Sequence, residues 1–348
     1  MAQPSSAITR FDLSMSYVEF SLAANRRKFI GLNVLPPIGV AQEASDFLKL
    51  LVESFLTKSE DTERAPKSTY KRSDYEWDND SYATVEHGVE EVADDATIER
   101  YGDIVRVEQI AIMRAVNRVL QSLEQDIADA VFNTTTWTGA ALTTAIGTSW
   151  VTANKATADP IADVDGAREK VKTSAGMAPN AVVMTDLDFV NCIRTDRIEN
   201  LLKYDAMTVM MALQGGTNVD IVNSAAQALA GVFQVEKVLI GQSFKNTADR
   251  AQAVAFSRFW SSGNVMVCHI NADGMSGDLE APMPNIGRTV FSTKNGEPLP
   301  GSDDGGFGSL LFDEYRDEPV RGSVFRPRNK RQVKILHKEA GHLLTGAS

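Results

Sequence analysis

The sequence predicts an α+β fold, and three observations support this prediction. The segment from Asp103 to Phe132 repeats apolar residues at three- and four-residue steps, with no Gly or Pro inside it, which predicts one long amphipathic helix. Shorter helix and strand patterns follow without strict alternation, which favours a mixed fold over a doubly wound one. Of the 348 residues, 43% are hydrophobic and 23% are charged, so the chain has enough apolar sequence to bury a core.

The first 54 residues are predicted to form an N-terminal arm. They contain too little periodic apolar sequence to close a core of their own. The pair Pro36-Pro37 also requires an extended backbone, because proline fixes its own φ and keeps its predecessor out of the helical region.

Residues 55–85 are predicted to form an extended β loop. Nearly half of the residues in its central part are charged, with both signs mixed. Tyr75 and Trp77 alternate with acidic residues, and a period of two indicates a strand with one aromatic face. An isolated two-stranded ribbon is only marginally stable in water, so it needs support. Two interpretations stay open: a solvated hairpin, or an arm whose aromatic face contacts a neighbouring chain.

The long helix predicted at about 103–132 dominates the region 86–158. Acidic residues precede it, which suits the positive end of a helix dipole. At 1.5 Å per residue it would form a rod of roughly 43 Å, long enough to act as a beam across the molecule. Its expected buried stripe is Ile112, Val116, Val119, Leu120, Leu123, Ile127 and Val131. Residues 133–155, rich in Thr, Ala and Gly, predict irregular or β structure.

From Asp159 onward the chain repeats a rhythm of helix followed by strand. A helix is expected to begin at Asp159-Pro160, with Asp163 as its cap and Gly176 as its end. A buried strand and a further helix follow it. The other expected elements are a helix at 225–233, strands at 238–240, 253–256, 265–270 and 332–336, and a loop over 271–308.

No motif for catalysis or cofactor binding is complete in this sequence. His337 and His342 are five residues apart with Gly341 between them, whereas the helical zinc motif needs a spacing of four. The glycine-rich segment 301–308 lacks the lysine of a phosphate-binding loop and carries two aspartates instead. We therefore expect no catalytic residues, no metal site and no cofactor.

The charge balance limits the kinds of partner. The chain has 46 acidic and 35 basic residues and a net charge of −11, which argues against binding nucleic acid through a global basic field but not against enclosing it. The locally basic C-terminal segment is expected to pair with acidic surface of the same or a neighbouring chain. Its cations are Arg321, Arg326, Arg328, Lys330, Arg331, Lys334 and Lys338.

Two further features bear on the compartment. Cys192 and Cys268 both lie in apolar surroundings, which indicates buried thiols rather than a disulfide framework. No apolar stretch approaches the ~20 residues of a membrane span, and residues 1–10 lack the pattern of a secretory signal. We expect a soluble protein made in a reducing cytoplasm, with no membrane partner.

Several blocks, in this order, resemble the major capsid proteins of tailed phages and prophages. Residues 174–204 contain S-A-G-M-A-P-N before a buried strand, then D-R-I and K-Y. Residues 228–241 read A-L-A-G-V-F-Q-V-E-K-V-L-I-G. The end carries E-P-V-R-G, V-K-I-L and E-A-G-H-L-L. Each block alone is weak, but their order over most of the chain carries the resemblance.

The resemblance implies the capsid fold named after phage Hong Kong 97. Its parts would be the arm (1–54), the extended β loop (55–85), a peripheral domain with a long spine helix (86–158), and an axial domain (159–260). Residues 261–348 would return to the peripheral domain and end in the C-terminal strand.

The implied function is that of a structural protein rather than an enzyme. Such subunits form hexamers and pentamers of an icosahedral virion shell that is assembled in the bacterial host cytoplasm and encloses double-stranded DNA without reading its sequence. A portal protein and a separate scaffolding protein are expected partners, and a decoration protein is a further one that some shells carry. The candidate contacts between subunits lie in the extended loop: Arg64, Lys67, Lys71, Arg72, Tyr75 and Trp77.

Two alternatives remain at this point. An encapsulin-like compartment would have the same fold but would enclose an enzyme cargo instead of a genome. An enzyme with an unrecognised site is the weaker alternative, because only the ordinary composition supports it.

Overall fold

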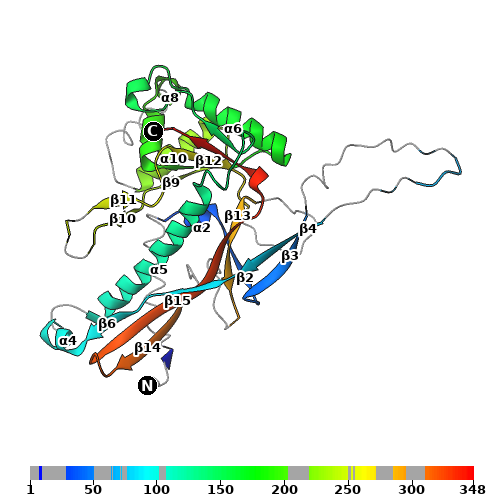
Figure 1. Cartoon of the computed structure of the whole chain (residues 1–348). Helices are drawn as coiled ribbons and strands as arrows, with labels where there is room; N and C mark the ends of the chain where they lie inside the picture. The colour runs from blue at the N-terminus through cyan, green and yellow to red at the C-terminus, as the bar shows by residue number, and fades with distance from the viewer. Residues whose placement is uncertain are drawn as a thin grey trace.

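The computed structural model describes residues 8–9, 29–50, 64, 66–70, 72, 77–101, 107–202, 219–249, 252–253, 255–271, 285–294 and 310–348 (Figure 1). The helices are α2 (Gly31–Val34), α4 (Asp95–Tyr101), α5 (Val107–Val131), α6 (Pro160–Ala175), α7 (Asp186–Ile193), α8 (Asp196–Leu202) and α10 (Val219–Val232), with 3-10 turns η1 (Thr152–Asn154) and η3 (Lys338–Ala340). The strands are β1 (Ile8–Thr9), β2 (Pro37–Val40), β3 (Ala44–Leu50), β4 (Trp77–Ala83), β5 (Val85–Gly88), β6 (Glu91–Asp94), β7 (Thr143–Ala145), β8 (Ala181–Thr185), β9 (Lys237–Gly241), β10 (Phe244–Asn246), β11 (Phe256–Arg258), β12 (Asn264–Cys268), β13 (Gly287–Ser292), β14 (Leu311–Asp317), β15 (Gly322–Ile335) and β16 (Gly341–Thr345). The mixed α and β content predicted from the sequence is confirmed.

Helix α5 crosses the molecule as a beam and joins two of its hydrophobic cores (Figure 1). Its first half packs, through residues such as Ile112 and Val116, against the sheet that contains β14 and β15. Its second half packs, through residues such as Leu123 and Ile127, beneath the second sheet. All seven apolar positions of the predicted stripe are buried, so the predicted long amphipathic helix is confirmed. The described helix starts at Val107 rather than Asp103, and residues 102–106 lie outside the described part of the chain.

The second sheet has five strands in the order β7-β16-β12-β8-β9. Side chains alternate across β8: Val182 and Met184 face a core shared with α6, α7, α8 and α10, whereas Ala181 and Val183 face α5. The sheet is therefore buried on both faces and forms the middle layer between helices.

This sheet draws its strands from a wider stretch of chain than the predicted axial region 159–260. Strands β12 and β16 pair with each other and with β8 and β7, so segments on both sides of that region enter the sheet. The strand pattern of 264–268 and 341–345 indicates β structure, but only backbone pairing decides which sheet a strand joins.

The other sheet is centred on β15, which pairs with β14 and β13 and also with β5 and β6. Strand β13 lies inside the segment 271–308 that was predicted to be a loop, so that prediction is wrong for residues 287–292. All six residues of β13 are buried between β2 and β15. The short run Thr289-Val290-Phe291 was its only signal. A Cβ at Gly287 would lie 2.5 Å from the carbonyl oxygen of Lys334, so glycine permits this close pairing.

Helix α6 begins and ends as predicted, but with a different cap. The Asp159 carboxylate accepts from the backbone N–H of Ala162, so Asp159 is the N-cap and not Asp163. The Asp163 carboxylate instead accepts a hydrogen bond from the buried indole of Trp150 at 2.9 Å. Gly176 ends the helix in the left-handed conformation at φ 68°, as expected for this position.

Glu124 lies where the arm, helix α5 and the second sheet meet. Its buried carboxylate accepts hydrogen bonds from the backbone N–H groups of Ile30 (3.1 Å) and Gly31 (2.8 Å) and from the indole N–H of Trp260 (2.6 Å). Burial raises the pKa of Glu124, and these three hydrogen bonds act in the opposite direction by favouring the ionised form. A Cβ on residue 31 would lie 2.6 Å from this carboxylate, so the approach requires glycine.

We expect Glu124→Gln to lower the free energy of unfolding by about 1–3 kcal/mol, because the amide would turn an NH2 group toward buried donors. Urea unfolding followed by tryptophan fluorescence measures this. Glu108→Gln, which lies on the same helix in its first turn and has an exposed side chain, is the matched control and should change stability by less than about 0.5 kcal/mol. Equal stability of the two variants would contradict the role assigned to Glu124.

His342 is a second buried polar group, on strand β16. Its Nδ1 lies 2.8 Å from the Ala141 carbonyl oxygen and its Nε2 lies 2.9 Å from Thr144 Oγ1. Lys170 also donates to Thr144 Oγ1, which leaves the hydroxyl proton for Nε2. This arrangement suits a neutral imidazole that donates from Nδ1. Burial lowers the pKa of His342, the hydrogen bond to the Ala141 carbonyl opposes this shift, and the charge of Lys170 adds to the lowering.

We expect this histidine to make stability depend on pH. Because its pKa in the folded chain is below the ordinary value of 6.5, the unfolded chain binds the proton first as the pH falls. The contribution of His342 is therefore present above about pH 6.5 and is lost as the pH falls from that value toward the folded pKa. Urea unfolding at about pH 7.5 and about pH 5.5 should show a smaller loss of stability for His342→Gln than for the wild type. His87, whose pKa is also lowered, is present in both proteins and cancels.

Candidate inter-subunit surface

The extended loop is carried by a two-stranded ribbon that projects from the body of the molecule (Figure 1). Strands β3 and β4 pair antiparallel, in a register that runs from Ala44 opposite Ala83 to Leu50 opposite Trp77. Phe47 and Tyr82 stack across the ribbon with ring centroids 6.3 Å apart. The ribbon therefore begins at Ala44, within the residues that the sequence assigned to the arm.

Cations of β15 hold the base of this ribbon. Lys334 Nζ lies 2.6 Å from an Asp80 carboxylate oxygen and also donates to the Ser81 carbonyl oxygen at 2.8 Å. Lys330 forms an ion pair with Glu43 at 2.8 Å, and the hydrogen bond and charge of Lys330 lower the pKa of Glu43. The side-chain oxygen of Gln332 accepts from the Ala83 backbone N–H at 2.7 Å. The ribbon is thus anchored by polar contacts to one long strand.

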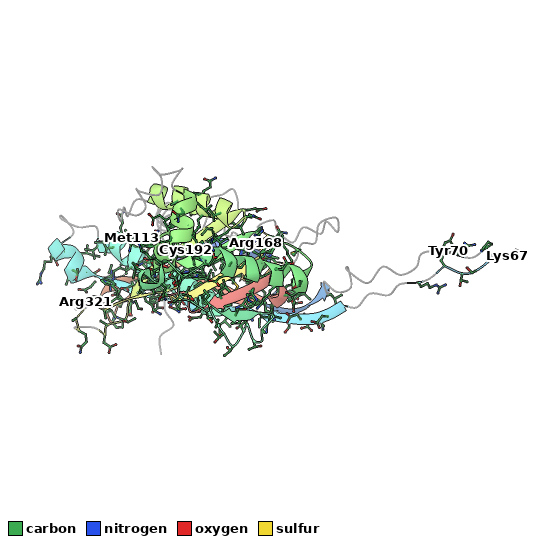
Figure 2. The ribbon with its side chains drawn as sticks, turned by 90° about the horizontal axis from the view of Figure 1, so that it is seen from above. Lys67, Tyr70, Met113, Arg168, Cys192 and Arg321 are labelled. Atoms are coloured by element: carbon green, nitrogen blue, oxygen red, sulfur yellow. The ribbon has the colours of Figure 1, made fainter. Side chains whose placement is uncertain are left out.

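The described part of the loop tip is cationic and aromatic. Lys67 and Tyr70 lie at its far end, on the opposite side of the molecule from Met113 and Arg321 (Figure 2). The Arg64 guanidinium stacks over the Tyr70 ring at 4.4 Å, and Tyr70 is 75% exposed. Lys67 adopts a left-handed backbone at φ 69°, which is costly for a residue with a side chain.

The structure describes some of the six predicted contact residues and not others. Arg64, Lys67 and Arg72 are exposed in the loop, and Trp77 opens strand β4. Lys71 and Tyr75 lie outside the described residues. Sequence reasoning missed Tyr70, although an aromatic residue among charged neighbours was a signal. The role of the six predicted residues as inter-subunit contacts remains a prediction.

Five of the seven cations in the basic C-terminal segment form ion pairs with acidic residues of their own chain, which is one of the two arrangements expected. On β15, Arg326 contacts Glu90 at 2.5 Å, Arg328 contacts Asp313 at 2.8 Å, and the buried Arg331 contacts Asp126 at 2.8 Å. Arg331 also donates to Ser122 on α5, which ties this strand to the long helix. These cations are therefore paired within their own chain.

The described part of the chain offers no candidate metal centre. Its His, Cys, Asp and Glu residues include no group of three placed to hold a metal ion. Cys192 and Cys268 are free and fully buried; burial raises the pKa of Cys192 well above its ordinary value and that of Cys268 to about 12. The glycine-rich segment 301–308 lies outside the described residues. Among the described helices, none combines the length and apolar character that crossing a bilayer requires.

This architecture is similar to that of known phage proteins. The major capsid protein of Burkholderia phage BcepMu is 24% identical over 324 residues, which cover 92% of this chain and 91% of that protein. A phage-related protein from Bordetella bronchiseptica RB50 superposes with a TM-score of 0.64 at 17% identity over 99% of both chains. The mature capsid of bacteriophage PhiM1 matches with a TM-score of 0.50 at 12% identity, over 89% of this chain and 84% of that one. The chain has the Hong Kong 97-like capsid fold.

This capsid fold confirms the resemblance inferred from the order of sequence blocks. No family model matches the chain. The resemblance depends on the order of several blocks, because each block alone is weak. The two matches cover 92% and 99% of the chain.

We expect Lys334→Ala to loosen the ribbon without unfolding the subunit. Exposed and half-exposed ion pairs contribute up to about 1 kcal/mol, so global stability should fall by no more than that. Hydrogen exchange of the backbone amides in residues 77–83 should become faster, as peptide-resolved mass spectrometry can measure. Lys294→Ala is the control, because its ammonium lies 3.7 Å from Glu43 and is 60% exposed. Unchanged exchange in Lys334→Ala would show that the ion pair does not anchor the ribbon.

Proposed function

We propose that this chain is the major capsid protein of a tailed double-stranded DNA phage, which assembles into hexamers and pentamers of an icosahedral shell. The observation that carries the proposal is the capsid fold over nearly the whole chain, together with a ribbon that projects beyond the subunit without a core of its own. A two-stranded ribbon is marginal by itself in water, so its tip gains stability by lying on a neighbouring subunit.

Assembly on this proposal proceeds by mass action over many weak, repeated contacts. The tip residues Arg64, Lys67 and Arg72 would exchange ion pairs with the acidic excess of an adjacent copy, and Tyr70 would bury its ring there. Lys71, Tyr75 and Trp77 belong to the same proposed contact. Each exposed pair contributes little alone, but a shell repeats it in every subunit.

The named regions and the other partners follow from the same proposal. The sheet around β15 would form the peripheral domain, with α5 as its spine, and the five-stranded sheet the axial domain. A portal protein, a separate scaffolding protein and in some shells a decoration protein would join the assembly in the host cytoplasm. The genome would be enclosed without sequence reading, in keeping with the net charge of −11. The chain would act as a structural protein and not as an enzyme.

A compartment for an enzyme cargo is not favoured, because the curated relative is a phage protein.

Electron microscopy of the expressed protein, purified over a range of ionic strengths, tests the proposed function. Shells or capsomers with hexameric and pentameric symmetry are expected. A protein that stays monomeric at every concentration and salt condition would refute the proposal.

The ribbon register defines a matched variant for this experiment. Leu50 and Trp77 are paired across β3 and β4, so a two-residue Asn-Gly turn can join them and replace residues 51–76. We expect this variant to keep its circular dichroism spectrum and its unfolding midpoint, because the ribbon base is unchanged, but to form no shells. Normal shells from the shortened chain would contradict the role of the loop, and loss of the fold would contradict the assignment of the loop as a separate projection.

A further inference from the structure

A second, shorter hairpin projects beside the long helix (Figure 1). Strands β10 and β11 pair antiparallel, with Phe244 opposite Arg258 and Asn246 opposite Phe256. Residues that are directly opposite in an antiparallel pair lie on the same face, so these four side chains form one face of the hairpin. Lys245 and Ser257 form the other face.

The polarity of this hairpin is the reverse of the usual one. The polar face points inward: Lys245 donates to the Gln125 side chain on α5, and Ser257 has a buried hydroxyl. The aromatic face points outward, with Phe244 45% exposed and Phe256 73% exposed. A strand pair normally turns its apolar side chains toward its own core, so this outward aromatic face is built to be covered from outside.

Internal contacts hold the outer face in shape. The Arg258 guanidinium forms a two-pronged ion pair with Asp186, at 2.7 and 3.3 Å, and lies over the Phe244 ring at 5.0 Å. The Asn246 side chain accepts from the backbone N–H groups of Ala248 and Ala255 and closes the turn. A face that is already ordered loses little conformational entropy when a partner covers it.

The same chain carries a second exposed apolar pair at a different place. Ile110 is 44% exposed and Met113 is 39% exposed, and they are three residues apart on α5, so they are neighbours on its outer surface. Lys245 anchors the hairpin at Gln125, twelve residues further along the helix than Met113, or about 18 Å along its axis. Because the aromatic face also points away from α5, its two phenylalanines do not contact Ile110 and Met113 of the same chain.

The size of the aromatic face restricts its occupant. A whole phenylalanine offers roughly 200 Å², so the exposed parts of the two rings provide roughly 200–300 Å². A stable two-protein interface needs about 800 Å² from each partner. This face therefore cannot hold a partner alone and requires one that other contacts also hold, as adjacent copies in a shell are.

We propose that the outer face of the β10–β11 hairpin, with Phe244 and Phe256, packs on Ile110 and Met113 of a second copy of this chain. Two different patches meet in this contact, so it is heterologous and can be repeated from subunit to subunit. The inference rests on the proposed capsid function and adds an inter-subunit contact that is separate from the ribbon.

Cysteine cross-linking tests the geometry. Phe256→Cys and Met113→Cys chains are prepared separately, mixed, assembled and treated with a short bismaleimide. Cys192 and Cys268 are buried and their thiol pKa values are raised, so the wild type provides the background. Cross-linked dimers are expected in the mixture but not in either variant alone. Their absence from assembled shells, or dimers from Phe256→Cys alone, would overturn the proposal.

A surface variant tests the contribution of the contact to assembly. Phe256→Ser should keep the unfolding midpoint of the wild type, because the ring is exposed, and should lower shell yield by at least about tenfold. Gln252→Ser, an exposed residue in the same turn, is the control and should assemble normally. If wild-type shells form and Phe256→Ser assembles equally well, this inference fails while the proposed function stands. If the wild type forms no shells, the proposed function itself fails.

Discussion

The buried carboxylate of Glu124 connects parts of the chain that are far apart in sequence. It accepts hydrogen bonds from the backbone of residues 30 and 31 and from the indole of Trp260, and it lies on the helix that contributes to two of the hydrophobic cores. A buried acceptor with three donors is costly to disrupt, because each donor would lose its partner away from water. Residues 30–31, helix α5 and the segment that leads into β12 are therefore held in one relative arrangement.

Arg331 performs the corresponding task at the other sheet. It is buried on β15 and contacts Ser122 and Asp126, which lie two residues before and two residues after Glu124 on helix α5. Helix α5 thus presents polar side chains to two sheets within a few residues, on faces next to its apolar stripe. The projecting ribbon is anchored to the same strand, through Lys330 and Lys334.

Local pattern and composition were sufficient to predict the long helix, the buried cysteines and the order of blocks. For the C-terminal cations they predicted pairing with acidic surface, but left open whether that surface belongs to the same or a neighbouring chain. Strand β13 was missed because its six residues include Arg288 and stand between glycine, proline and aspartate. Its β structure comes from pairing with β2 and β15, which lie far away in sequence. The cap of α6 was predicted at Asp163 but is Asp159 for a similar reason, since the Asp163 carboxylate accepts a hydrogen bond from the distant Trp150 indole.

Periodicity and composition act over short stretches of chain, so they were sufficient to predict the class of fold, the long helix and a charged, aromatic loop without a core. Contacts between distant segments are needed to see which strands share a sheet, that the ribbon begins at Ala44, and that Glu124 accepts from three donors. The outward aromatic face of the β10–β11 hairpin also belongs to this second group. A three-residue strand has no readable alternation, and its inner face is defined only by the helix against which it packs.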